Sequence, residues 1–301
     1  MQDPNETTNA IYCVEKRISS NASERSDSEQ ADPYVDEEIL ACDFNEPLTI
    51  LYQDEHFVAV DKPPGLLVHR AELTPRDETV LLQKLRDQIG QFLYPVHRLD
   101  RPTSGLIVFG LTSPAAAALV DLFTRRQVVK RYRALIRGYL YPTGKIDLPL
   151  RERFGEDRPS YNRDRHPAQT AVTRYETLKW YEAPWPTQSF STSRYAFIEV
   201  KPETGRWHQI RRHLNHISHP ILGDKRHGDN RHNAIFANRL LVSRMLLSAY
   251  ELEFRHPFTQ VDLKLQATLG WKFQDTLDAL APYEVDMNLT HLPPQPDSQR
   301  A

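Results

Sequence analysis

Four polar side chains that could do chemistry stand together in the segment HRLDRPTSGLIVFGL, residues 97–111: His97, Arg98, Asp100 and Arg101. The apolar half of the segment is typical of a buried strand, and a strand entrance does not need a carboxylate between two arginines in order to fold. An ionised carboxylate can act as a nucleophile or as a general base. Taken alone, however, Asp100 is read more readily as a turn residue before a proline.

A second candidate is Arg211 in the segment RWHQIRRHLNHI, which has the periodicity of a helix. Arg211 lies about 100° round this helix from the apolar stripe, so we expect a half-buried side chain. The strand IEVKP and a Thr-Gly turn precede the helix. We expect Thr204 to cap the helix and Gly205 to take a positive φ, which together would hold the arginine rigidly.

The same region is rich in histidine and raises the question of a metal. His213, His216 and His219 follow at a spacing of three residues, so on one straight helix they drift round the surface instead of converging. No metal site is therefore expected. Tyr132, in KRYRALI, is by default one more half-buried aromatic residue of a strand.

Short β-branched and aromatic runs dominate the rest of the chain and are typical of strands: LTILYQ, HFVAVDKP, GLIVFGL, VVKRYRALIRGYL, AVTRYETLKWY, RYAFIEVKP, MLLSAYELEF and VDLKLQA. The first two are expected to form a hairpin. Helical periodicity occurs in SPAAAALVDLFTRRQ, in RWHQIRRHLNHI and in WKFQDTLDAL. Strands outnumber helices without alternating strictly with them, which predicts an α+β fold with a mixed or antiparallel central sheet and flanking helices.

Charge is divided unevenly along the 301 residues. Residues 1–50 hold twelve acidic and three basic side chains, a net charge of −9, whereas residues 51–301 carry +7. We predict an acidic, disordered leader at 1–47, a catalytic domain at 48–285 and a flexible tail at 286–301. Only two cysteines occur, and no signal peptide or membrane span is evident, so we expect a cytoplasmic protein without disulfides. A basic body suggests a polyanionic partner without proving one.

The nine residues HRLDRPTSG resemble the signature of the RluA family of pseudouridine synthases, HRLD, two variable residues and TSG, at every fixed position. The segment LYQDEHFVAVDKPPGLLVH is similar to that family's opening hairpin and KPxG turn. KRYRALIRG is similar to its tyrosine strand, and GRWHQIRRHL followed by HPILGDKRHG to its arginine motif. The resemblance covers about residues 48–270 and implies the pseudouridine synthase fold, with an active-site cleft.

The resemblance also implies a reaction and roles for these residues. Such enzymes isomerise uridine in RNA: the N-glycosidic bond breaks, the uracil rotates, and C5 is joined to the ribose C1′. Asp100 corresponds to the catalytic aspartate, which acts as nucleophile or as base on the ribose. Arg211 corresponds to the arginine that pairs with it. Tyr132 corresponds to a tyrosine that stacks on the target base and helps to remove the C5 proton.

Two further positions are implied to bind the substrate. Arg98 corresponds to the residue that takes the place of the extracted base, and Leu247 to an apolar wall of the uracil pocket. The family pattern usually has histidine after this leucine, whereas this sequence has Ser248. No cofactor is implied, because bond breaking and bond making balance within one substrate.

The segments VHRAELTPRDETVLLQKLRDQIGQ and GDKRHGDNRHN are most similar to the branch of the family that modifies tRNA, for which the expected target is uridine 65. We expect tRNA as partner and neither DNA, a membrane nor an obligate protein partner. Three alternatives stay open from the sequence: a synthase acting on ribosomal RNA, a non-catalytic RNA-binding module and, more distantly, a metal-dependent hydrolase.

Overall fold

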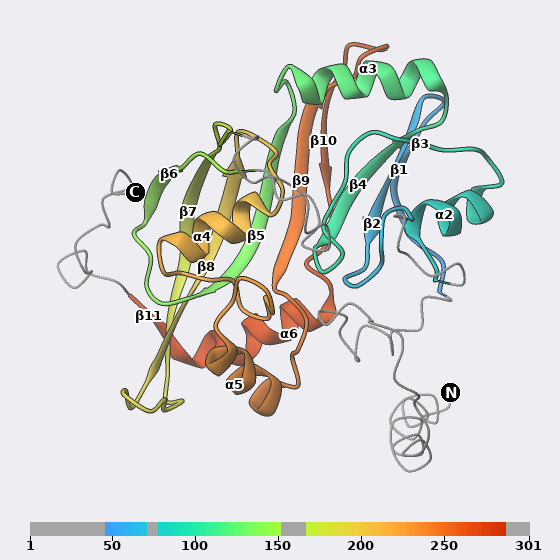
Figure 1. Ribbon diagram of the computed structural model, residues 1–301. Coiled ribbons are helices and arrows are strands. Elements are labelled where there is room, and N and C mark those ends of the chain that lie inside the picture. The colour runs from blue at the N-terminus through green and yellow to red at the C-terminus, as the bar shows by residue number, and fades with distance from the viewer. Residues whose placement is uncertain (1–45, 71–77, 152–166, 287–301) are drawn as a thin grey trace, which may run out of the picture. The chain divides into compact units, whose positions relative to one another are not determined.

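The computed structural model describes residues 46–70, 78–151 and 167–286, and a single branched sheet runs through them (Figure 1). Its strands follow the order β1-β2-β4-β9-β5-β8-β7-β11, with β3 attached to β4, β6 to β7 and β10 to β9. The strands are β1 (Thr49–Gln53), β2 (Phe57–Lys62), β3 (Tyr94–Pro95), β4 (Ser104–Gly110), β5 (Val129–Arg137), β6 (Thr143–Asp147), β7 (Val172–Ala183), β8 (Ser193–Pro202), β9 (Leu247–Arg255), β10 (Asp262–Gln266) and β11 (Glu284–Val285). The helices are α2 (Leu81–Ile89), α3 (Ser113–Thr124), α4 (Gln209–His216), α5 (Asn230–Leu240), α6 (Trp271–Leu280) and the 3-10 turn η2 (Ala281–Tyr283).

The predicted α+β class is confirmed. All eight predicted strands form, and β1 and β2 make the expected antiparallel hairpin. The sheet is mixed, because β4 pairs with β9 in parallel while the neighbouring pairs are antiparallel. Helices α3, α4 and α6 lie where the periodicity predicted them, whereas α2 and α5 were not predicted.

The start of α4 differs from the expectation. The residue that precedes the helix is His208, with a φ of 49°, and Gly205 does not take a positive φ. The Thr204 hydroxyl donates to Gln209 Oε1 at 2.7 Å and accepts from the Val172 amide at 3.0 Å. Thr204 therefore ties the turn to β7 instead of capping the helix.

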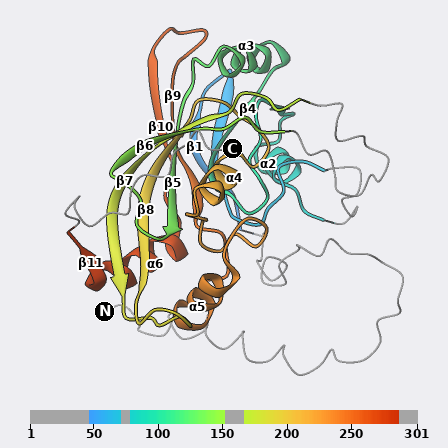
Figure 2. The same ribbon diagram turned by 60° about the vertical axis from the view of Figure 1, so that its left-hand side comes forward.

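Helices cover both faces of the sheet. α4 packs on β5, β7 and β8, and α2 packs on β2 and β4 on the same side (Figures 1 and 2). α6 and α5 pack on the opposite face of β5, β7 and β8. Alternate residues of each strand consequently enter different cores, as Ala134 and Leu135 of β5 do.

Most of the predicted leader (1–47) and of the predicted tail (286–301) lies outside the described residues, which begin at residue 46 and end at residue 286. Their proposed boundaries, and those of the catalytic domain, stay predictions. Within the described ranges, no helix has both the length and the apolarity needed to cross a membrane.

Candidate active site

The loop that carries Asp100 reaches the middle of the sheet. Directly after it, β4 begins beside β9, with Ser104 opposite Ser248 and Gly105 opposite Ala249. On the other side of β9, Ala249 is also the register partner of Tyr132 in β5. Gly105 has a φ of 105°, and a Cβ atom there would lie 2.2 Å from the Ala249 carbonyl oxygen, so only glycine permits this approach.

Lys62 and Arg101 fasten this loop to the turn of residues 62–65. The buried Lys62 ammonium donates to the carbonyls of Pro63, Leu66 and Arg101 at 2.8–3.0 Å. The Gly65 amide donates to the Arg101 carbonyl at 2.9 Å, and Arg101 Nε donates back to the Gly65 carbonyl at 3.0 Å. Arg101, to which the sequence assigned no role, thus holds the loop that carries Asp100 in place.

His97 has a structural role as well. Its Nε2 accepts a hydrogen bond from the Val108 amide at 3.1 Å, and its ring stacks on Phe123 at 4.6 Å. Burial, followed by the charge of Lys130, lowers the pKa of His97 to about 3. A neutral ring is the form that can accept this bond, so His97 anchors the start of the loop on β4 and α3.

Arg211 joins Asp100 to a second carboxylate, that of Asp224. The guanidinium donates from Nη1 to Asp100 Oδ2 at 3.2 Å, and from Nε and Nη2 to the two oxygens of Asp224 at 2.7 and 2.8 Å. The exposed fraction of the side chain is 5% for Arg211 and 1% for Asp224, against 23% for Asp100. Arg211 is therefore more deeply buried than the half-buried position expected, and Asp100 is the member of the group that a substrate can reach.

The two carboxylates differ in acidity. Burial raises the pKa of Asp100 above its ordinary value, and the charge and hydrogen bond of Arg211 oppose this only in part. Burial acts in the same direction on Asp224, but its two bonds from Arg211 and the His227 amide hold the pKa below the ordinary value. Asp224 is thus the permanent counterion of Arg211, while Asp100 is the carboxylate suited to exchanging a proton or attacking a substrate.

Tyr132 lies where the two main apolar clusters of this face meet, because it packs against both of them. The register of β5 against β9 shifts between Arg131 and Tyr132, and a bulge of this kind re-aims the side chain beside it. Burial and then the negative charge of Asp100 raise the pKa of the Tyr132 phenol well above its usual range. The hydroxyl is therefore protonated at neutral pH.

Leu247 and Arg98 take different positions. Leu247 is buried in the cluster against which Tyr132 packs, as an apolar wall requires. Arg98 is exposed on the loop. The burial of His69 and then the charge of Arg98 lower the pKa of His69. Arg98 therefore lies near the segment that follows the KPxG turn. Ser248, which follows Leu247, faces the other side of β9, and among the described residues its buried hydroxyl has no hydrogen-bond partner.

The histidines after Arg211 bind other parts of the protein. His213 contacts Thr173 Oγ1 at 2.9 Å and the Leu148 carbonyl at 3.0 Å, and His219 contacts the Arg137 carbonyl at 3.0 Å. In the described part of the chain, no group of His, Cys, Asp or Glu side chains is arranged to hold a metal ion.

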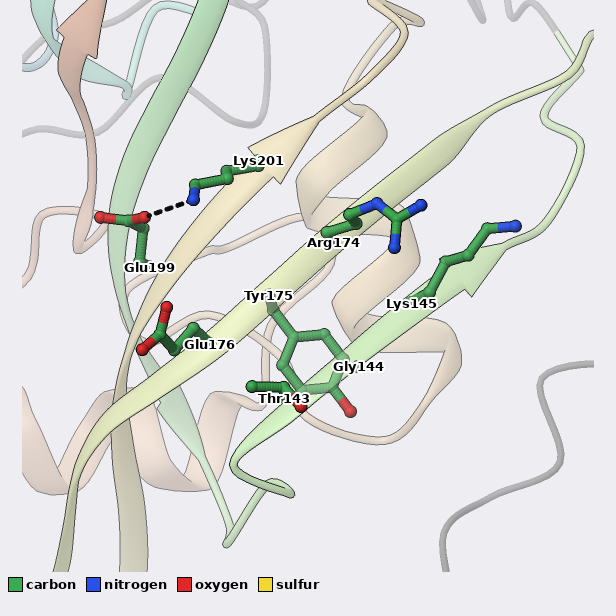
Figure 3. A pocket seen from close by; sticks show the side chains of 8 residues that line it. All are labelled: Thr143, Gly144, Lys145, Arg174, Tyr175, Glu176, Glu199 and Lys201. Carbon is green, nitrogen blue, oxygen red and sulfur yellow. Dashed lines mark ion pairs between the residues drawn. The ribbon is translucent and has the colours of Figure 1, made fainter.

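A separate hollow of about 350 Å³ lies over β6, β7 and β8 (Figure 3). Glu199 pairs with Lys201 at 3.3 Å (Figure 3). Two more of its charged side chains are paired, Lys145 with Asp147 at 2.7 Å and Arg174 with Glu203 at 2.5 Å. Glu199 is the register partner of Arg133, the residue after Tyr132, so it faces the opposite side of the sheet from Tyr132. The hollow is therefore distinct from the Asp100 site.

Sequence reasoning missed three members of this site: Asp224, Lys62 and His208, whose Nε2 lies 3.7 Å from Asp100 Oδ2. Asp224 lies in GDKRHG, a segment that resembles the family pattern but does not by itself reveal that its carboxylate reaches back thirteen residues to Arg211. Lys62 lies in the KPxG turn. The sequence alone does not show whether a lysine beside prolines is buried or exposed to solvent, whereas the structure shows its bonds to three carbonyls.

Comparison with known proteins shows the family of the chain. The family described as RNA pseudouridylate synthase matches residues 56–216. The tRNA pseudouridine synthase C of Vibrio cholerae serotype O1 is 44% identical over 230 residues, which are 76% of this chain and 94% of the relative. The protein of the same name from Pasteurella multocida is 42% identical over 244 residues, 81% of this chain and 99% of the relative.

Among solved structures, human RNA Pseudouridylate Synthase Domain Containing 4 superposes with a TM-score of 0.59 at 28% identity, covering 80% of this chain and 95% of that one. Human RNA Pseudouridylate Synthase Domain Containing 1 has a TM-score of 0.56 at 23% identity. The match covers 80% of this chain and 98% of that one, and it supports the fold alone. The predicted fold is confirmed.

Proposed function

Because the chain belongs to the RNA pseudouridylate synthase family, of the RluA type, we propose that its substrate is tRNA and that it isomerises uridine 65 to pseudouridine in the cytoplasm. The choice of tRNA is supported by relatives named tRNA pseudouridine synthase C, of which the matched region covers nearly the whole length. The position within tRNA follows from the resemblance of the sequence to the tRNA-modifying branch.

One observation carries the catalytic assignment: Arg211 Nη1 lies 3.2 Å from Asp100 Oδ2 although the two residues are 111 positions apart. A turn aspartate has no need of a buried arginine that is itself held by a second carboxylate. Both contacts to Asp100 from the residues around it, those of Arg211 and His208, go to Oδ2, and among the described residues Oδ1 accepts no hydrogen bond. Oδ1 is therefore the oxygen available to the ribose.

In the proposed reaction, Asp100 acts on the ribose, as nucleophile at C1′ or as base at C2′, while the bond from C1′ to N1 breaks. The uracil then turns and the bond from C5 to C1′ forms; the bond from Asp100 to C1′ breaks in the nucleophilic route, and Asp100 returns the proton to C2′ in the other. The proton lost from C5 is balanced by one gained at N1. Tyr132 stacks on the base and, through its hydroxyl, assists the removal of the C5 proton.

The base must first leave its stack, which costs a few kcal/mol. We assign Arg98 to the vacated position, because an exposed and planar guanidinium at the rim of the site can stack there. Leu247 closes the apolar side of the pocket beneath Tyr132.

The test is carbodiimide mapping of tRNA and ribosomal RNA from a strain that lacks this gene, complemented with the wild-type chain or with Asp100→Asn. We expect the modification at tRNA position 65 to disappear in the deletion strain and to return only with the wild-type chain. An unchanged signal at position 65 with a loss in ribosomal RNA would move the substrate to the ribosome, and no loss in either pool would contradict the proposal.

A further inference from the structure

Two histidines form a hydrogen-bonded pair directly beside Asp100. His208 Nδ1 lies 2.9 Å from His227 Nε2, and the other ring nitrogen of His208, Nε2, lies 3.7 Å from Asp100 Oδ2. The His208 side chain is only 11% exposed. The described reaction steps use neither ring.

The orientation of His208 is imposed by the fold. The residue has a φ of 49° at the start of α4, a left-handed conformation that a non-glycine residue rarely adopts and that must be maintained by its surroundings. Its ring stacks on Trp207 with centroids 3.7 Å apart and planes 17° apart. The direction in which Nε2 points is therefore fixed toward Asp100.

Asp224 holds the backbone at His227. Asp224 Oδ1 accepts the amides of Arg226 and His227, each at 3.0 Å, besides the bond from Arg211 Nη2. One buried carboxylate thus binds both the Arg211 guanidinium and the backbone segment that carries His227.

The direction of the bond between the histidines follows from electrostatics. Burial and the surrounding arginines lower the pKa of His208 to about 2, and burial lowers that of His227 to about 4, so both rings are neutral near pH 7. If His208 Nδ1 donated to His227, the lone pair of His208 Nε2 would face a carboxylate oxygen and be repelled. If His227 donates, His208 carries its proton on Nε2 and presents it to Asp100.

We infer that His227 donates from Nε2 to His208 Nδ1, and that it thereby fixes His208 as the tautomer whose Nε2–H is a second donor to Asp100 Oδ2, beside Arg211. The separation of 3.7 Å closes to a hydrogen bond when substrate is bound, as catalytic contacts commonly do. With Oδ2 held by two donors, Oδ1 is directed at the ribose. His227 is a positioning residue, and the inference rests on the proposed function of the site.

The experiment compares His227→Gln, whose side-chain amide can still donate, with His227→Glu, whose carboxylate can only accept. In 15N-histidine-labelled protein, the ring nitrogen shifts of His208, assigned with a His208→Gln sample, report which nitrogen carries the proton. We expect Nε2–H in the wild type and in His227→Gln, and Nδ1–H in His227→Glu.

Single-turnover kinetics on tRNA supply the second measurement. A hydrogen bond to a charged group is worth roughly tenfold or more in rate, so His227→Glu should lose at least about tenfold in the rate of the chemical step with unchanged tRNA affinity. His227→Gln should stay within about threefold of the wild type.

Wild-type His208 protonated on Nδ1, or equal activity of the two variants, would overturn the inference. If the Glu variant does not fold, the tautomer measured in the wild type and in His227→Gln decides. Failure of the proposed function is distinguishable, because the wild-type chain would then not modify tRNA whatever the tautomer of His208.

Discussion

At the scale of single residues, the site depends on how one guanidinium is shared. Arg211 gives two donors to Asp224 and a third to Asp100. Arginine is required for this arrangement because its planar fork offers donors in three fixed directions, whereas a lysine ammonium is a point charge on a flexible stem. Asp224 orients the fork, and the more accessible Asp100 receives the remaining donor.

Replacing Arg211 by lysine should therefore cost activity while keeping the positive charge. We expect the rate of modification to fall about 10–100-fold, since a hydrogen bond to a charged group is lost. Arg212→Lys, one position along the same helix, is the matched control and should stay near the wild type. Comparable losses in the two variants would contradict the assignment.

The pH dependence of kcat/KM tests the state of Asp100. Burial raises the pKa of Asp100 above 3.8, so activity should fall, as the pH is lowered, at a higher pH than an ordinary aspartate would give. In Arg211→Lys the acid limb should move further up, because the hydrogen bond that opposes burial is gone. If kcat/KM fell at the same acidic pH in the wild type and in Arg211→Lys, a group other than Asp100 would be responsible for the fall.

Tyr132 is expected to stack on the base through its ring and to assist proton removal through its hydroxyl. A substitution by phenylalanine distinguishes these two roles. Tyr132→Phe keeps the ring that packs on the base and removes the hydroxyl, so we expect tRNA affinity to persist while the release of the C5 proton slows about 100-fold. Tyr195→Phe removes a buried hydroxyl on the opposite face of the sheet and should leave the rate unchanged. Wild-type proton release by Tyr132→Phe would remove the hydroxyl from the mechanism.

At the scale of elements, the turn at 62–65 and the loop at 97–103 behave as one unit. The buried Lys62 donates to three carbonyls, and one of them belongs to Arg101. Lys62→Met would remove this donor from the carbonyls of Pro63 and Leu66, at a cost of about 1–3 kcal/mol each, while the Arg101 carbonyl would keep the Gly65 amide. We therefore expect a lower free energy of unfolding and a misplaced Asp100.

The loss of stability in Lys62→Met should depend on pH. Burial lowers the pKa of Lys62 in the folded protein from 10.5 to about 7. Between these values the unfolded chain binds more protons than the folded one, so the stability of the wild type should rise with pH, by at most about 1.4 kcal/mol per unit. Chemical denaturation of the wild type, Lys62→Met and the exposed control Lys179→Met from pH 7 to 9 measures this. A parallel pH dependence in the wild type and Lys62→Met would contradict it.

The strands and helices differ in how well the sequence predicts them. Strands such as β5 and β9 were predicted because their residues alternate or are uniformly apolar. The helix α5 was not predicted, since its apolar residues are few and Phe236 is the only one fully buried; the signal available was Asp229, whose side chain caps the helix by accepting the amides of Arg231 and His232. The helix α2 had apolar spacing at Leu81 and Leu85 that could have revealed it.

The same limit applies to the site. Asp100, Tyr132 and Arg211 were predicted, but only because each lies in a motif that resembles a family. Their proximity depends on the parallel contact of β4 with β9 and on the shift in register at Tyr132, which local patterns do not encode. The Thr204 cap was wrong for a related reason: its hydroxyl is used by Val172 of β7, a partner distant in sequence.

At the scale of the whole molecule, charge is the property most relevant to RNA. The positive charge of residues 51–301 is not exposed at Arg131 and Arg133 of β5. These two arginines are paired with Glu199, Glu251 and Glu253. We expect the acidic residues 1–46 to limit nonspecific association with RNA by lowering the net charge.

Deleting residues 1–46 should therefore tighten binding to RNA that is not a substrate and steepen its dependence on salt. A neutral replacement of equal length serves as control and should behave like the deletion, because charge is the property removed. Binding constants measured over a range of salt concentrations check this. Unchanged affinity and specificity in the deletion would refute this role.

The most direct test of the account follows the hydrogen at C5 of the target uridine. Purified wild-type chain, Asp100→Asn and Arg212→Lys are incubated with tRNA transcribed from C5-tritiated UTP, and the tritium released into water is counted while tRNA binding is measured in parallel. We predict release by the wild type and by Arg212→Lys, and no release by Asp100→Asn despite normal binding. Release by Asp100→Asn at the wild-type rate, or binding without release by the wild type, would contradict the account.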